Sequence, residues 1–107
     1  MATTEIIYYQ GETIGLYIEG DSVIDFDNNP FKVLYYNAVS KTQRVLIDKS
    51  EFVQISANKY YAEIANTVTA ALQRGQYIEE KLYGDAYTSI SKVNAFVLNE
   101  SEIKKEL

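Results

Sequence analysis

The chain has 107 residues, of which 47% are hydrophobic, 13% aromatic and 23% charged, and its net charge is −5. This length suits one domain with a single hydrophobic core, and the composition argues against a disordered chain. Cysteine, histidine and tryptophan are absent, which excludes disulfides, thiolate metal sites, cysteine nucleophiles and histidine general bases.

Short runs of tyrosine and β-branched residues, separated by Gly, Asn, Asp and Ser clusters, predict β-strands along most of the chain. We expect strands over Thr4–Gln10, Thr13–Glu19, Phe31–Val39, Arg44–Asp48, Glu51–Ile55, Lys59–Ile64, Gln76–Tyr83 and Tyr87–Leu98. Alternation of Ile14, Leu16 and Ile18 with other residues is typical of a half-buried strand. In the last strand, a break in the alternation at Ser91-Lys92 predicts a β-bulge.

One segment has a different periodicity. Val68 and Leu72 recur at helical spacing, which predicts one short helical turn near residues 67–73. Asn66 is expected to be its N-cap, and Gly75 the left-handed residue beyond its end.

Seven to nine short strands with turns every 8 to 12 residues are the signature of a β-sandwich or a β-barrel. Helices do not alternate with the strands, so a parallel α/β sheet is not supported. We therefore expect a single domain over residues 1–107, in which residues 99–107 form a charged tail.

Four segments carry a resemblance to a known group. They are Gln10-Gly11-Glu12-Thr13, Val23-Ile24-Asp25-Phe26, the stretch from Asn66 to Tyr77, and Asn94-Ala95-Phe96-Val97-Leu98. In order, they resemble small immunoglobulin-like β-sandwich domains of bacteriophage and prophage virion proteins, similar to the N-terminal domain of phage baseplate upper proteins. The resemblance implies an all-β, antiparallel, immunoglobulin-like sandwich. It also implies a non-catalytic structural role in a virion, as a capsid-decorating, connector, tail or baseplate subunit.

Tyrosine dominates the sequence, with ten copies that include three adjacent pairs. Neighbours on a strand point to opposite faces, so one ring of each pair should face the core and the other should face outward or contact a partner. The candidate interface therefore consists of Tyr8, Tyr9, Tyr35, Tyr36, Tyr60 and Tyr61. The expected partners are other protein subunits, in a homo-oligomer or a larger assembly.

Two groups of acidic residues could suggest chemistry. The loop Asp25–Asn29 offers oxygen ligands for Ca²⁺, but it lacks the glycine and distant glutamate of an EF-hand, and a polar loop with Asx turns explains it. Glu79 and Glu80 are neighbours on a strand, so they face opposite ways and cannot share a substrate. We therefore expect no enzyme activity, no cofactor and no metal.

Other partners are constrained by charge and hydropathy. Fifteen carboxylates against ten basic groups disfavour nucleic acid. No apolar run is long enough for a membrane helix and no signal peptide is evident, so a virion component made in the host cytoplasm is the expectation. The alternative is a carbohydrate-binding module, in which several tyrosines form a coplanar platform on a monomer. An assembly subunit would instead form a symmetric oligomer.

Overall fold

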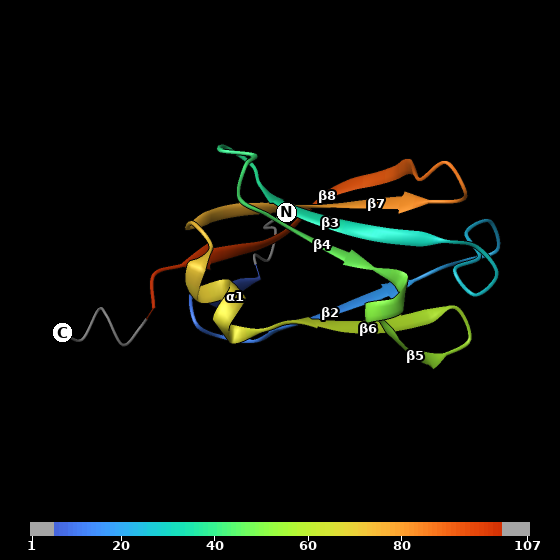
Figure 1. Cartoon of the computed structure of the whole chain (residues 1–107), viewed down its shortest axis with the longest axis horizontal. Coiled ribbons are helices and arrows are strands. Elements are labelled where there is room, and N and C mark those ends of the chain that lie inside the picture. The colour runs from blue at the N-terminus through green and yellow to red at the C-terminus, as the bar shows by residue number, and fades with distance from the viewer. Residues whose placement is uncertain (1–5, 102–107) are drawn as a thin grey trace, which may run out of the picture.

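The computed structural model describes residues 6–101 of the chain. Two β-sheets face each other, and one short helix lies at one end between them (Figure 1). The larger sheet has the strand order β1 (Ile7–Tyr9), β8 (Thr88–Asn99), β7 (Gly75–Tyr83), β3 (Phe31–Asn37) and β4 (Arg44–Asp48). The smaller sheet has the order β2 (Ile14–Glu19), β6 (Lys59–Ile64) and β5 (Val53–Ser56). The fold is mostly β with one short helix, as the sequence predicts.

Strand direction corrects one part of the prediction. β1 runs parallel to β8, with Ile7 opposite Val97 and Tyr9 opposite Asn99, while the other strand pairs are antiparallel. The larger sheet is therefore mixed and curves like half of a barrel, so the expected wholly antiparallel sandwich is wrong in this respect. Alternation of side chains cannot show strand direction, because parallel and antiparallel strands have the same period of two.

The core lies between the two sheets and is rich in aromatic rings. In β2 the alternating residues Ile14, Leu16 and Ile18 are buried, as predicted. On the facing sheet, the rings of Tyr77 and Phe96 stack with their centroids 5.1 Å apart. Each fully buried large apolar side chain contributes about 1.5–3 kcal/mol, so this layer holds the sheets together.

The short helix is α1 (Asn66–Ala71), close to the predicted residues 67–73. Its N-cap is Ala65 and not Asn66, because the Ala65 carbonyl accepts the first helical bonds, from the N–H groups of Val68 and Thr69. Gly75 does have a positive φ of 136°, but it begins β7 three residues after the C-cap Leu72, so its expected capping role is wrong.

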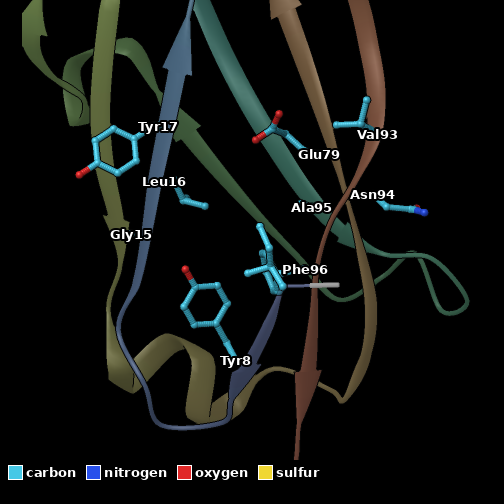
Figure 2. Close-up of a pocket in the computed structure, with 10 residues that line it drawn as sticks. Tyr8, Gly15, Leu16, Tyr17, Glu79, Val93, Asn94, Ala95 and Phe96 are labelled. Carbon is cyan, nitrogen blue, oxygen red and sulfur yellow. The ribbon is translucent and has the colours of Figure 1, made fainter. Parts of the chain in front are cut away.

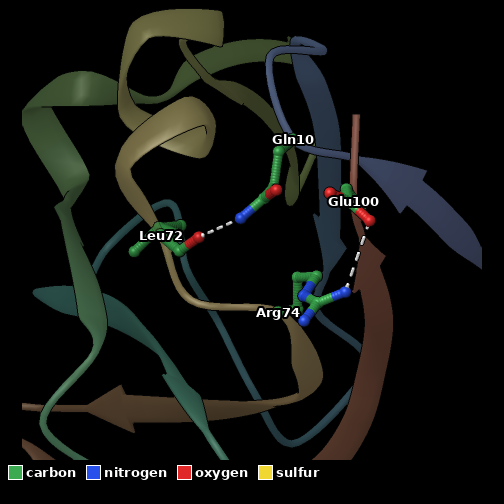
Figure 3. A network of polar contacts seen from close by, with 4 residues as sticks. All are labelled: Gln10, Leu72, Arg74 and Glu100. Atoms are coloured by element: carbon green, nitrogen blue, oxygen red, sulfur yellow. Dashed lines mark hydrogen bonds and ion pairs between the residues drawn. The ribbon is translucent and has the colours of Figure 1, made fainter. Parts of the chain in front are cut away.

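Side-chain contacts attach α1 to the loop between β1 and β2, and the segment after α1 to the end of β8. The Gln10 side chain donates a 2.8 Å hydrogen bond to the Leu72 carbonyl, and Arg74 pairs with Glu100 at 3.6 Å (Figure 3). The buried hydroxyl of Thr69 donates to the Glu12 carbonyl at 2.7 Å. These bonds close this end of the sandwich.

Several strand boundaries differ from the prediction. The expected strand Glu51–Ile55 is divided into a 3-10 turn, η1 (Lys49–Glu51), and β5, because the Glu51 and Asp48 side chains form a capping box. The first strand is β1 within the described residues, and the predicted start at Thr4 lies outside them. The register of β8 against β7 shifts twice, between Ser89 and Ser91 and at Ala95, so the first bulge lies directly before the predicted Ser91-Lys92.

Candidate functional site

The two long sides of the sandwich differ in how the edge strands of the two sheets are connected. On one side, the edge strands β4 and β5 are joined directly by η1, and Phe52 beside it is buried. On the other side the edge strands are β2 and β8. Within residues 6–101, β2 pairs only with β6, and β8 gains a second neighbour only at Val97–Asn99, where β1 pairs. The sandwich is therefore open between β2 and residues 88–96 of β8.

Two hollows lie along this open side, at successive residues of β2, β7 and β8, and we call them together the β2–β8 groove. Its wide end is lined chiefly by Tyr8, Leu16, Glu79, Val93 and Phe96. Its narrow end is lined chiefly by Glu19, Asp21, Lys81, Ile90 and Ser91.

The wide end has a volume of about 440 Å³. Figure 2 shows Leu16, Tyr8 and Phe96 converging on it from β2, β1 and β8, while the Glu79 carboxylate reaches in from β7. The Tyr8 ring packs edge-on against Phe96, with centroids 5.9 Å apart. This end is an apolar recess with a single carboxylate in it.

The narrow end has a volume of about 190 Å³ and is more polar. The Asp21 carboxylate accepts hydrogen bonds from the N–H groups of Ile24 and Val23, which hold its pKa below the ordinary value, so it is ionised at neutral pH. The Ser91 hydroxyl oxygen is buried and has no hydrogen-bond partner among residues 6–101.

The floor of the groove carries an ion pair. The Tyr35 hydroxyl donates a 2.6 Å bond to Glu79 Oε2, and Lys81 Nζ lies 3.2 Å from Glu79 Oε1. Burial, with the charge and hydrogen bond of Glu79, raises the pKa of Tyr35 far above its ordinary value. Tyr35 therefore stays a neutral donor and cannot act as a base at ordinary pH.

The rim of the groove exposes apolar side chains. Ile6 is 55% exposed and Val93 is 49% exposed, although both line the wide end. The regular part of the β8 edge, Ser91–Asn94, carries one charged side chain, Lys92, which pairs with Glu80 at 3.7 Å. Edges of this kind, with few charges, are templates for pairing with another strand.

The six predicted tyrosines do not form one surface. Tyr8 lines the groove, and Tyr35 lies behind its floor. Tyr60 is buried, with its hydroxyl bonded to Asp27 at 2.7 Å. Tyr61 is half-buried against Tyr17 on the outer face of the smaller sheet. Their role in an interface remains a prediction.

Tyr36 and Tyr9 are the remaining two of the six predicted tyrosines. Tyr36 is half-buried on the outer face of the larger sheet, where it lines a depression of about 290 Å³ with Arg44 and Lys92. Tyr9 is half-buried beside Tyr8. The pairs at 35–36 and 60–61 thus have one buried ring each, as predicted, whereas Tyr8 and Tyr9 are both half-buried.

Sequence reasoning missed Tyr17, which at 62% is more exposed than any of the six. Its ring lies beyond β2, tilted 50° against Tyr61 with centroids 4.8 Å apart (Figure 2). The alternation of Ile14, Leu16 and Ile18 could have found it, because it places Tyr17 on the opposite, outer face of the same strand. The prediction considered only adjacent pairs of tyrosines.

The acidic loop has the Asx turns that the sequence suggests. Asp25 Oδ1 accepts bonds from the N–H groups of Asp27 and Asn28. Lys49 Nζ donates hydrogen bonds to the carbonyl oxygens of Phe26, Asp27 and Asn29. The lysine ammonium therefore occupies the place that a metal cation bound to these oxygens would take. In the part of the chain that the structure describes, no group of three or more acidic, His or Cys residues could hold a metal.

Glu79 and Glu80 face opposite sides of the larger sheet, as predicted, because Glu79 bonds to the core residue Tyr35 and Glu80 pairs with Lys92. Glu79 is largely shielded from solvent. Its side chain is only 13% exposed.

Comparison with known proteins found no matching protein family, no similar curated protein and no similar solved structure. None of the helices within residues 6–101 has the length and apolar character needed to cross a membrane.

Proposed function

We propose that the protein is a non-catalytic structural subunit that acts through protein–protein contacts, with the β2–β8 groove as its contact surface. The observation that carries this proposal is the edge of β8 over residues 88–96, which pairs with no other strand on that side within residues 6–101, beside an apolar recess of about 440 Å³. Such an edge offers main-chain hydrogen bonds, and a neighbouring apolar recess offers burial, which together are the requirements for adding a strand from another chain.

The position of the subunit in a bacteriophage or prophage virion belongs to the same proposal. It is supported by the resemblance of the sequence segments to virion sandwich domains and by the two facing sheets. An immunoglobulin-like relationship is supported by the same arrangement, with β1 added to the edge of the last strand.

The geometry supports the carbohydrate-binding alternative less well. Sugar-binding platforms stack a ring on an open aromatic face. Here the most exposed tyrosine, Tyr17, is tilted 50° against its neighbour Tyr61, so the two rings are not coplanar.

Sedimentation velocity between 1 and 100 µM tests the proposed function. We expect the wild-type protein to self-associate and the Val93→Lys variant, which places a charge on the exposed β8 edge, to be monomeric. Val53→Lys is the matched control, because Val53 is 63% exposed on the smaller sheet and does not line the groove. A monomer at all concentrations, together with polysaccharide binding, would contradict the proposal.

A further inference from the structure

We propose that the outer face of the larger sheet carries a second contact site, which binds an acidic segment of a neighbouring subunit through a carboxylate and an apolar side chain beside it. This inference rests on the proposed function and adds a contact surface separate from the β2–β8 groove. The centre of the site is the depression of about 290 Å³ that is lined by Leu34, Tyr36, Lys41, Arg44, Glu80 and Lys92.

The depression lies across four neighbouring strands of the larger sheet. Tyr36 on β3 is directly opposite Arg44 on β4. Leu34 on β3 is directly opposite Glu80 on β7, which in turn is opposite Lys92 on β8. The helix α1 lies between the two sheets at one end, so it does not cover this outer face (Figure 1).

Two basic side chains of the depression have no partner among residues 6–101. Those residues include eight lysines and arginines, of which six contact a carboxylate, a carbonyl oxygen or an aromatic ring: Lys32, Lys49, Lys59, Arg74, Lys81 and Lys92. The other two are Lys41 and Arg44, and both line this one depression. The Tyr36 hydroxyl beside them likewise has no hydrogen bond within the described part of the chain.

These three groups together suit a carboxylate. A guanidinium can donate two parallel hydrogen bonds to a carboxylate, and an ammonium and a tyrosine hydroxyl are further donors. On the other side of the depression Glu80 pairs with Lys92 at 3.7 Å, so that side is already neutralised. The site therefore has room for one anionic group beside Arg44. The Glu80 carboxylate and the net charge of −5 disfavour a run of phosphates such as a nucleic acid backbone.

An apolar surface lies next to the two free cations. Leu34 lines the depression, and Leu46, directly opposite it on β4, is 46% exposed. The two leucines are two residues along their strands from Tyr36 and Arg44, and residues i and i+2 share a face about 6.6–6.8 Å apart. A bound segment with a large apolar side chain at this distance from its carboxylate would cover both leucines, which is favourable.

The size of the depression favours a side chain of a protein partner over a separate small ligand. Its volume of about 290 Å³ is at the lower end of ligand pockets, which measure about 300–1,000 Å³. The apolar surface also continues beyond it, at Leu46. A docked segment can cover the cations and the leucines together, whereas a small anion would contact the cations alone.

Two-dimensional NMR of the isotope-labelled protein tests this inference. The chain contains two arginines, Arg44 and Arg74, so their side-chain Nε–H signals separate the depression from the rest of the surface. The end-capped probe Thr-Leu-Thr-Glu-Thr-Leu-Thr presents a leucine two residues from glutamate in either chain direction. We expect it to shift the Arg44 signal and the backbone signals of Leu34 and Tyr36. The signal of Arg74, which pairs with Glu100, should not change.

Two control peptides separate the contribution of charge from that of apolar contact. One replaces the glutamate with glutamine, which keeps the size and removes the charge, and the other replaces both leucines with threonine. Hydrogen bonds to an ionised group are roughly twice as strong as neutral ones. We therefore expect the probe to bind about tenfold more tightly than the glutamine peptide at low ionic strength, and more tightly than the threonine peptide.

Two protein variants with the same change in net charge separate the depression from general electrostatics. Lys41→Gln with Arg44→Gln should weaken binding of the probe to the level of the glutamine peptide, measured at the backbone signals of Leu34 and Tyr36. Lys59→Gln with Arg74→Gln, at residues that do not line the depression, should retain the preference for glutamate.

Three results would overturn the inference. Equal binding of the glutamate and glutamine peptides, or no binding at millimolar concentration, would contradict the choice of a carboxylate. Equal shifts with inorganic phosphate at the same concentration would assign the depression to simple anions. Residues 102–107 include Glu102 and Glu106, so the titration is repeated with a protein that lacks them. Binding only after their removal would show that the chain's own end occupies the depression.

The proposed function is tested separately. It would stand after any of these three results if the wild-type protein still self-associates and Val93→Lys does not, because Val93 does not line the depression. Loss of that difference would contradict the proposed function itself.

Discussion

The hydroxyl of Tyr35 donates a 2.6 Å hydrogen bond to Glu79 Oε2, and the two residues are directly opposite each other on β3 and β7. Tyr35 has no exposed surface, whereas the Glu79 carboxylate reaches the open groove. The bond therefore joins the core to the floor of the candidate site.

Removing this donor should destabilise the fold. Tyr35→Phe leaves the half-buried carboxylate with one partner fewer, and a hydrogen bond to a charged group is worth about 1.5–3 kcal/mol. We expect a loss of that size in the free energy of unfolding, measured by urea denaturation. Glu79→Gln should cost less, because its amide oxygen still accepts the bond.

Tyr36→Phe is the control for that measurement. Tyr36 follows Tyr35 on the same strand but is half-buried on the opposite face, and substitutions of this kind usually change stability by less than about 0.5 kcal/mol. Equal losses for Tyr35→Phe and Tyr36→Phe would show that the bond to Glu79 contributes nothing specific.

Lys49 should be important for stability even though it is far from the groove. Its ammonium donates to the carbonyl oxygens of Phe26, Asp27 and Asn29 at 2.7, 3.3 and 3.0 Å. Lys49→Met keeps the length of the side chain but leaves these three acceptors without their donor, so we expect a loss of about 2–3 kcal/mol in the free energy of unfolding. Lys32→Met removes a lysine that lies over the Tyr87 ring at 4.0 Å and should cost less than about 1 kcal/mol. A similar cost for both variants would contradict the role given to Lys49.

Sequence patterns predicted most strands because alternation and turn residues are local signals. Arg44–Asp48 and Lys59–Ile64 were predicted with the observed bounds. The groove was not predicted, because it depends on which strands are at the edges of the sheets. The sequence of β8 does not show that, within residues 6–101, β1 pairs with it only along Val97–Asn99.

The tyrosine pairs illustrate the same limit within the candidate site. Alternation correctly predicted one buried ring in the tyrosine pair at 35–36 and one in the pair at 60–61. It could not predict which residue each tyrosine hydroxyl would contact. Tyr35 bonds to a residue 44 positions away and Tyr60 to one 33 positions away. Such partners are set by the packing of distant strands.

Tyr60 should make the fold sensitive to alkaline pH. Burial, the hydrogen bond to Asp27, and the charges of Asp27 and Asp25 raise the pKa of Tyr60 from its ordinary value of 10.0 to about 12. Because the folded-state pKa is above the unfolded one, this contribution to stability is complete below about pH 10 and is lost as the pH rises towards 12. Tyr60→Phe should reduce the fall in urea midpoint between pH 10 and 12. An unchanged fall in that variant would assign the effect to other groups.

Asn58 and Lys41 should respond in opposite ways to replacement by glycine. Both have positive φ, 60° and 59°, a region in which glycine has no steric cost. The Asn58 side chain, however, accepts a 2.7 Å bond from the Phe26 N–H and donates a 2.8 Å bond to the Ile24 carbonyl, whereas Lys41 is exposed.

Asn58→Gly loses both bonds, so we expect it to destabilise the fold by about 1–2 kcal/mol. Lys41→Gly only relieves the backbone, so we expect it to be neutral or to stabilise by up to about 1 kcal/mol. Thermal unfolding of the two variants measures the difference, and stabilisation by Asn58→Gly would show that its side-chain bonds matter less than its backbone conformation.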